Sequence, residues 1–194
     1  MMNRLLHIWI FLFIVLFAMD TEAQDRSRHS LGFIYGKGSQ TLLDVQYNYH
    51  IQLYQLQYGY ALVNKEKWST DLLIQPQFNF TEYRHVNNMP LVSNGYEYGV
   101  NIGLALKRYF FDGLLSYYVA ISFGPHYISG APERQTSGFI FSDNVYLGMT
   151  ARLDKNIYFE LRPAFRHISN ANLVKPNRGI NNMILNGGFY FYLN

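Results

Sequence analysis

The chain has 194 residues, a formal net charge of +3 and no cysteine. The lack of cysteine excludes a disulfide framework, a thiolate metal site, a cysteine nucleophile and a lipoprotein anchor. Tyrosine and phenylalanine are abundant, with 17 and 15 residues, whereas the modest charge gives no reason to expect a nucleic-acid partner.

The first 23 residues predict a secretory signal peptide. Arg4 precedes an apolar stretch at 8–19, and the small residue Ala23 ends the segment. This stretch is short for a membrane-spanning helix, which favours a cleaved signal over the alternative of an N-terminal anchor. We expect cleavage near Ala23 and one domain over residues 24–194. Export also argues against a nucleic-acid partner.

Beyond residue 24, the sequence alternates with a period of two in eight segments separated by polar or Gly/Asn-rich breaks. The predicted strands are 30–38, 54–62, 68–80, 96–106, 115–123, 145–153, 157–169 and 183–193. In the segment 96–106, Tyr96, Val100 and Leu104 share one face. Asn101 and Gly103 lie on the opposite face. Each strand therefore has a bulky apolar face and a face of small or polar residues.

This pattern is typical of a transmembrane barrel whose narrow interior is filled by small and polar side chains. A soluble barrel such as a lipocalin is the alternative, and it would place its apolar face inside. Here the apolar face is the bulkier one, and it would expose too much aromatic surface in water. We predict an all-β fold, an eight-stranded antiparallel transmembrane β-barrel.

Two polar residues near the end of the seventh predicted strand break its pattern. If both termini lie in the periplasm, this strand ends at the external side, and Phe165 belongs to its lipid-facing set. Parity then places His167 and Ser169 on the same face, about 6–7 Å apart along the strand. A polar pair facing lipid is costly unless it meets a lipid substrate. The alternative is that the strand ends at Phe165 and the pair lies in an aqueous loop.

The segment 167–181, "HISNANLVKPNRGIN", resembles the PagL family of outer-membrane lipid A 3-O-deacylases. The match consists of a His-x-Ser-Asn-Ala string followed by a Pro-Asn-x-Gly stretch. The resemblance implies that Ser169 is the nucleophile and His167 its general base. It also implies that Asn177 serves the oxyanion hole, with Asn170 supporting the same loop or acting only as a turn residue. The implied reaction removes the 3-position acyl chain of lipid A.

The sequence departs from the family at the third catalytic position, where Asn181 stands in place of a glutamate. An asparagine can orient the imidazole but supplies no negative charge. We expect reduced activity, a replacement acid, or no hydrolase activity. One candidate acid comes from strand register. If residues 154–156 close a hairpin, Asp143 lies opposite His167 on the outward face, within reach of its ring; otherwise Asp143 is a solvated rim residue.

Basic residues flank this segment at Arg166, Lys175 and Arg178. They are candidates for binding the lipid A phosphates, or they form an unspecific basic rim at the anionic membrane surface. The expected partners are lipid A or lipopolysaccharide and outer-membrane lipids, with a homodimer as a further option. We find no phosphate-binding glycine loop and no His/Glu metal spacing, and we expect no cofactor.

These observations leave three functions open for a barrel expected in the outer membrane of a Gram-negative bacterium. The first is a serine-type lipid A esterase. The second is a non-catalytic barrel that keeps the fold and the lipid contact, with Asn181 marking lost catalysis. The third is a structural or adhesion barrel in which the match is accidental. Convergence of His167, Ser169 and Asn177 on the outer surface would argue against the third.

Overall fold

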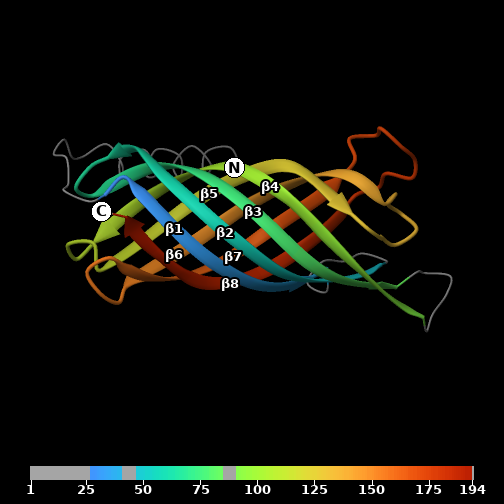
Figure 1. The fold of residues 1–194 in the computed structure, drawn as a ribbon, viewed down its shortest axis with the longest axis horizontal. Helices are drawn as coiled ribbons and strands as arrows, with labels where there is room; N and C mark the ends of the chain where they lie inside the picture. Colours follow the sequence, from blue (N-terminus) through green and yellow to red (C-terminus); the bar gives the residue numbers. More distant parts are fainter. Residues whose placement is uncertain (1–26, 41–46, 85–90, 194) are drawn as a thin grey trace, which may run out of the picture.

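The computed structural model describes residues 27–40, 47–84 and 91–193. Within them, eight antiparallel strands form one closed barrel in which β8 pairs with β1 (Figure 1). The strands are β1 (His29–Ser39), β2 (Asn48–Asn64), β3 (Trp68–Arg84), β4 (Val92–Phe110), β5 (Leu115–Ile128), β6 (Gly138–Arg152), β7 (Ile157–Ser169) and β8 (Ile180–Leu193). The predicted fold is confirmed, whereas the predicted signal peptide lies outside the described residues.

Several strands are longer than the alternation predicts. β6 begins at Gly138 rather than at residue 145, and β2 begins at Asn48 rather than at residue 54. The residues added to β2 still alternate, but in the opposite sense, because Tyr49, Ile51 and Leu53 point inward and are buried. The backbones of the added residues still continue the ladder, as the pairing of Phe141 with Ser169 shows. Backbone hydrogen bonding does not depend on the side chains, which is why the strands extend beyond the apolar band.

The two faces of the wall have the predicted sense. Outward residues such as Phe80, Ile102 and Leu147 are exposed, whereas inward residues such as Gln55 and Asn101 are buried. No helix in the described part of the chain combines the length and apolar character that a membrane span requires.

Paired polar side chains occupy the interior of the barrel. The carboxylate of Glu97 accepts hydrogen bonds from Arg166 and from Nδ1 of His126, the latter at 2.6 Å. Arg162 Nη1 lies 3.2 Å from Oε1 of Glu160. All five side chains are buried. These ion pairs connect β4, β5 and β7 through the lumen, and pairing is what makes burial of such charges tolerable.

The two ends of the barrel differ in the length of their connections. Short turns at 65–67, 111–114 and 153–156 lie at the end where β8 terminates, and the longer segments 129–137 and 170–179 lie at the other (Figure 1). Outer-membrane barrels have short periplasmic turns and longer external loops, which predicts that the long-loop end is external. At the turn 153–156, Leu153 N–H donates to the Ile157 carbonyl at 2.8 Å, which confirms the predicted hairpin closure.

Candidate active site

Three polar residues from adjacent strands form one row on the outer surface. Asp143 of β6 pairs in register with His167 of β7, and His167 pairs with Asn181 of β8. Ser169 is the last residue of β7 and pairs with Phe141. His167, Ser169 and Asn181 are all partly exposed. The predicted parity is confirmed, and β7 continues beyond Phe165 instead of ending there.

The imidazole of His167 is held by Asn181. Its Nδ1 lies 2.6 Å from Asn181 Oδ1. The backbone of Asn181 is itself fixed by the buried Tyr47, whose hydroxyl accepts from Asn181 N–H at 2.7 Å and donates to Asn181 O at 3.1 Å. The third site position therefore orients the ring, as expected for an amide, and Tyr47 in turn supports that position.

Gly179 packs directly beneath the imidazole. It has φ of +66°, and a Cβ placed there would overlap Cε1 of His167 and lie 3.1 Å from Nε2. Other residues adopt this left-handed backbone at a cost, and here a side chain would also displace the ring. The glycine of the Pro-Asn-x-Gly stretch is thus required by both the backbone conformation and the space beside His167.

Asparagine side chains shape the β7–β8 loop, residues 170–179. Asn170 N–H donates to Asn177 Oδ1 at 2.9 Å, and Asn170 Nδ2 donates to Val174 O at 2.7 Å. Asn177 Nδ2 makes a long contact of 3.4 Å to Oδ1 of Asn172, which has φ of +64°. The Asn177 oxygen thus organises the loop, so its Nδ2 is the group that can donate to a substrate.

The β5–β6 loop, residues 129–137, supports the β7–β8 loop from the side. Gln135 pairs with Asn177 in an isolated bridge, and its Oε1 accepts from Gly179 N–H at 3.3 Å. Thr136 N–H donates to Pro176 O at 2.9 Å. Sequence reasoning missed both Gln135 and Tyr47, because neither belongs to a local motif. Gln135 meets the site only after β6 and β7 pair, and Tyr47 only after β8 pairs with β1.

Asp143 takes the register predicted for it. It is exposed, and together with His167 it lines a groove of about 280 Å³. Among the described residues, no hydrogen bond joins Asp143 to the imidazole, which instead contacts Asn181. Below the two polar groups, the groove runs between apolar side chains of β5, β6 and β7, namely Ile121, Phe123, Val145 and Phe165.

The basic residues divide between the inside and the outside of the barrel. Arg166 is fully buried in the lumen, where Nε donates to Ser142 at 3.0 Å and Nη2 contacts Glu97. Strand parity turns it away from its neighbour His167, so the expectation that Arg166 binds lipid phosphate is wrong. Lys175 and Arg178 are exposed on the β7–β8 loop, where phosphate can reach them.

Within residues 27–40, 47–84 and 91–193, no group of three or more His, Cys, Asp or Glu side chains is arranged to hold a metal ion. Beside His167, whose imidazole is held through Nδ1, the site instead has the hydroxyl of Ser169 and the amide of Asn177. That combination is suited to acyl transfer rather than to metal binding.

Comparison with known proteins decides the family. A family model described as lipid A 3-O-deacylase (PagL) matches residues 52–190. This chain belongs to the PagL family. The resemblance seen in the segment 167–181 is thereby confirmed, and the family and the barrel together support an outer-membrane lipid A 3-O-deacylase.

The chain is similar to solved structures at low sequence identity. A crystal structure of the outer membrane enzyme PagL superposes with a TM-score of 0.56 and 14% identity, covering 84% of this chain and 99% of that one. OprG from Pseudomonas aeruginosa covers 90% of this chain and 100% of its own, with 10% identity and a TM-score of 0.46. No curated protein sequence matches the chain significantly.

Proposed function

We propose that this PagL-family member hydrolyses the 3-position acyl ester of lipid A by a serine–histidine mechanism at the lipid-facing external rim. The observation that carries the proposal is the 2.6 Å contact between His167 Nδ1 and Asn181 Oδ1, on the same face as Ser169. Because an amide oxygen only accepts, Nδ1 carries the proton and Nε2 keeps its lone pair. The imidazole is thereby set in the tautomer that a general base needs.

The reaction follows from these groups. Ser169 Oγ attacks the ester carbonyl while His167 Nε2 takes the hydroxyl proton. Asn177 Nδ2 donates to the oxyanion of the tetrahedral intermediate. His167 then returns the proton to the leaving sugar oxygen, and a second cycle with water frees the fatty acid from Ser169. No hydrogen bond joins Ser169 to His167 among the described residues, so that contact forms when substrate is bound.

The groove beside His167 suits the acyl chain of the substrate. The side chains of Ile121, Val145 and Phe165 make its wall apolar, and Asp143 and His167 lie at the end nearer Ser169. A lipid in the outer leaflet can therefore place a hydrocarbon chain against the wall with its ester at the level of Ser169.

Two groups bear on the missing family glutamate. Asn181 orients the imidazole but contributes no charge, which lowers the stabilisation of the imidazolium formed during the reaction. Asp143 pairs with His167 from β6, on the side away from Asn181, and is the candidate for that charge.

Lys175 and Arg178, exposed on the adjacent loop, are the candidates for binding the phosphates of the lipid A head group.

A second function, a non-catalytic barrel that contacts lipid, is favoured by one observation. The contact of His167 is with the neutral amide of Asn181, and no acidic side chain in the described part of the chain is hydrogen-bonded to its ring. The arrangement of His167, Ser169 and Asn181 would be the same in both functions. Only turnover distinguishes them.

Mass spectrometry of lipid A from cells expressing the chain separates the two. The wild type is expected to remove one ester-linked acyl chain from the 3-position, and Ser169→Ala is expected to leave lipid A intact. Ser137→Ala, which changes an exposed loop serine, is the matched control and retains activity. Unchanged lipid A with the wild type, in membranes where the barrel is folded, would establish the non-catalytic function for that substrate.

A further inference from the structure

The backbone of β8 at Asn181 is paired by a side chain instead of by a strand. In the described part of the chain, the last register pair between β1 and β8 joins Ser39 to Met183, so Asn181 lies two residues beyond it. The N–H and the C=O of Asn181 both meet the hydroxyl of the buried Tyr47, at 2.7 and 3.1 Å. Tyr47 therefore takes the place that a neighbouring strand would fill at this position.

This arrangement brings the side chain of Asn181 close to His167. The backbone groups of Asn181 point towards Tyr47, so its register pair with His167 on β7 is of the kind without backbone hydrogen bonds. In such pairs the Cα atoms are about 4.5 Å apart, compared with about 5.5 Å in hydrogen-bonded pairs, and the side chains are closer. The 2.6 Å contact between His167 Nδ1 and Asn181 Oδ1 is made from this close pair.

Tyr47 is in turn held by Arg134 of the β5–β6 loop. The guanidinium carbon of Arg134 lies 4.4 Å from the centre of the Tyr47 ring, within the range of a cation–π contact. Arg134 Nη2 donates to Arg178 O at 2.9 Å, and Arg178 N–H donates to Arg134 O at 2.9 Å. Arg178 lies between Asn177 and Gly179. Arg134 therefore joins the β7–β8 loop to the tyrosine that holds Asn181.

We propose that Tyr47 is a positioning residue for the hydrolysis proposed above, and that Arg134 holds Tyr47 in this role. Tyr47 acts through Asn181, by keeping its amide oxygen opposite Nδ1 of His167. The hydrogen bond made by one ring nitrogen sets the tautomer of a histidine, so this contact keeps the proton on Nδ1 and the lone pair on Nε2. Without the Tyr47 hydroxyl, the backbone of Asn181 loses its partner and both tautomers become populated. The effect on rate rests on the proposed function, whereas the tautomer is measured without turnover.

Nuclear magnetic resonance of the folded full chain, labelled with 15N in its histidine rings, tests the proposal at a pH where the rings are neutral. The spectrum of His167→Gln identifies the signals of His167. In the wild type, His167 is expected to carry its proton on Nδ1. Tyr47→Phe is expected to give a mixture of the two tautomers. An unchanged tautomer in Tyr47→Phe would overturn the proposal, whether or not the chain cleaves lipid A.

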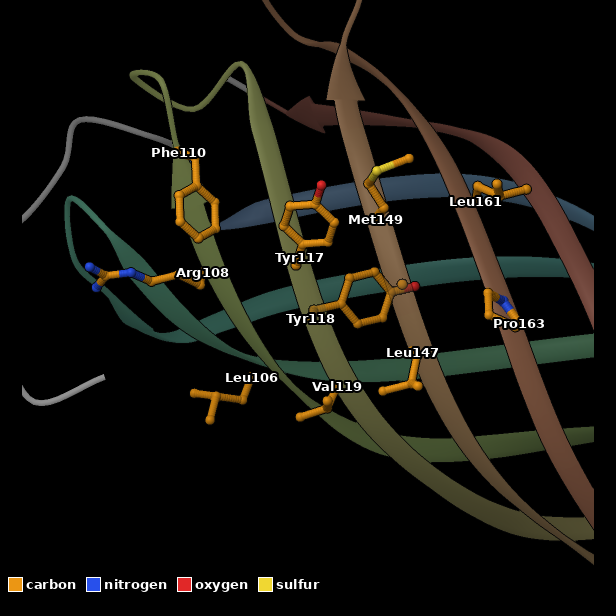
Figure 2. A pocket seen from close by; sticks show the side chains of 11 residues that line it. Leu106, Arg108, Phe110, Tyr117, Tyr118, Val119, Leu147, Met149, Leu161 and Pro163 are labelled. Carbon is orange, nitrogen blue, oxygen red and sulfur yellow. The ribbon is translucent and has the colours of Figure 1, made fainter. Parts of the chain in front are cut away.

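Tyr118→Phe is the matched control for loss of a buried tyrosine hydroxyl. Tyr118 lies near the start of β5, at the short-turn end of the barrel (Figure 2). Its hydroxyl donates to Glu160 at 2.7 Å, and Lys107 Nζ lies 5.6 Å from the centre of its ring. The variant therefore loses a buried hydrogen bond far from the site, and we expect the tautomer of His167 to stay unchanged. Heat-modifiable gel mobility verifies that each variant is folded.

Steady-state kinetics on lipid A separates positioning from substrate binding. Tyr47→Phe is expected to lower kcat roughly tenfold and to change KM by less than about twofold, because the base is displaced but no substrate contact is lost. An equal loss of kcat in Tyr118→Phe would assign the effect to stability and overturn the proposal. If Tyr47→Phe changes the tautomer but even the wild type leaves lipid A intact, the positioning role is supported and the proposed hydrolysis fails.

Arg134 is tested by two further variants. Arg134→Met is expected to lower kcat about threefold at unchanged KM, the loss expected for one cation–π contact at a partly exposed site. Arg134→Lys, which keeps a cation beside the ring, is expected to recover most of that rate. A rise in KM alone would mean that Arg134 binds the lipid A phosphates, and it would overturn the role of Arg134 in holding Tyr47.

Discussion

Two histidines of this barrel, His126 and His167, occupy opposite sides of its wall. His126 lies in the lumen, 2% exposed, and contacts the carboxylate of Glu97 at 2.6 Å and Oδ1 of Asn101 at 3.2 Å. His167 lies on the outer surface, partly exposed, with its Nδ1 held by Asn181. Both ring nitrogens of His126 are engaged, whereas Nε2 of His167 is left for chemistry.

The comparison shows that a histidine–carboxylate contact does not by itself identify a catalytic site. The barrel has its histidine–glutamate pair inside, where Arg166 completes a buried ion cluster that no lipid can reach. On the outer surface, His167 is paired with an amide. His167 is the candidate base because its ring is exposed on the outer surface and its Nε2 lone pair is not engaged by any described residue, and not because it has the stronger electrostatic partner.

Replacing each histidine by leucine is expected to separate the two roles most sharply. His167→Leu should lower the rate of lipid A deacylation by on the order of 10³-fold, because Ser169 loses its base, with little change in stability. His126→Leu should leave the rate nearly unchanged but lower the free energy of unfolding by about 2 kcal/mol, because a buried charged group loses a hydrogen bond. Deacylation assays and urea unfolding in lipid vesicles measure the two effects, and a reversed pattern would contradict the assignment.

Restoring a carboxylate at position 181 tests whether the missing charge limits the rate. Asn181→Glu is expected to raise kcat roughly 10- to 100-fold, since the carboxylate stabilises the imidazolium that forms as Ser169 attacks. The matched control is Asn181→Gln, which has similar size and no charge. Equal rates for the two variants would show that charge at this position does not limit the reaction.

Gly179→Ala tests the support beneath the imidazole. The added methyl group meets Cε1 of His167, and the backbone at +66° disfavours alanine. We expect a roughly tenfold loss of kcat, as displacement of a catalytic group by a fraction of an ångström reduces productive geometry. Gly138→Ala, at a glycine with positive φ and open space around it, is the control for backbone strain alone. Similar losses in both variants would assign the effect to strain rather than to His167.

Asp143→Asn is expected to have the smallest effect. If Asp143 supplies charge across the strand pair, kcat falls about threefold, a loss of roughly 0.7 kcal/mol that is modest because the carboxylate is exposed to solvent. In the Asn181→Glu background the same substitution should have no effect, because the new carboxylate replaces it. A loss that persists at full size in that background would show that Asp143 acts on something other than the imidazolium.

Much of the fold follows from side-chain alternation, since a lipid-facing barrel must place apolar residues outside and small or polar ones inside. The period of two placed Phe165, His167 and Ser169 on one face, and the short hairpin at 154–156 placed Asp143 opposite His167. The strand ends could not be predicted, because beyond the apolar band the ladder depends on backbone groups that every residue carries.

The sequence by itself determined the barrel, the outward direction of the His167 and Ser169 pair, and the string at 167–181 that resembles the PagL family. Tertiary structure alone decided which groups complete the site: Tyr47 reaches it across the β8–β1 closure, and Gln135 reaches it from the neighbouring β5–β6 loop. It also placed Arg166 in the lumen, with Glu97 as its partner. The physical reason is that alternation is a property of one strand, whereas these contacts join segments far apart in the sequence that meet only when several strands have paired.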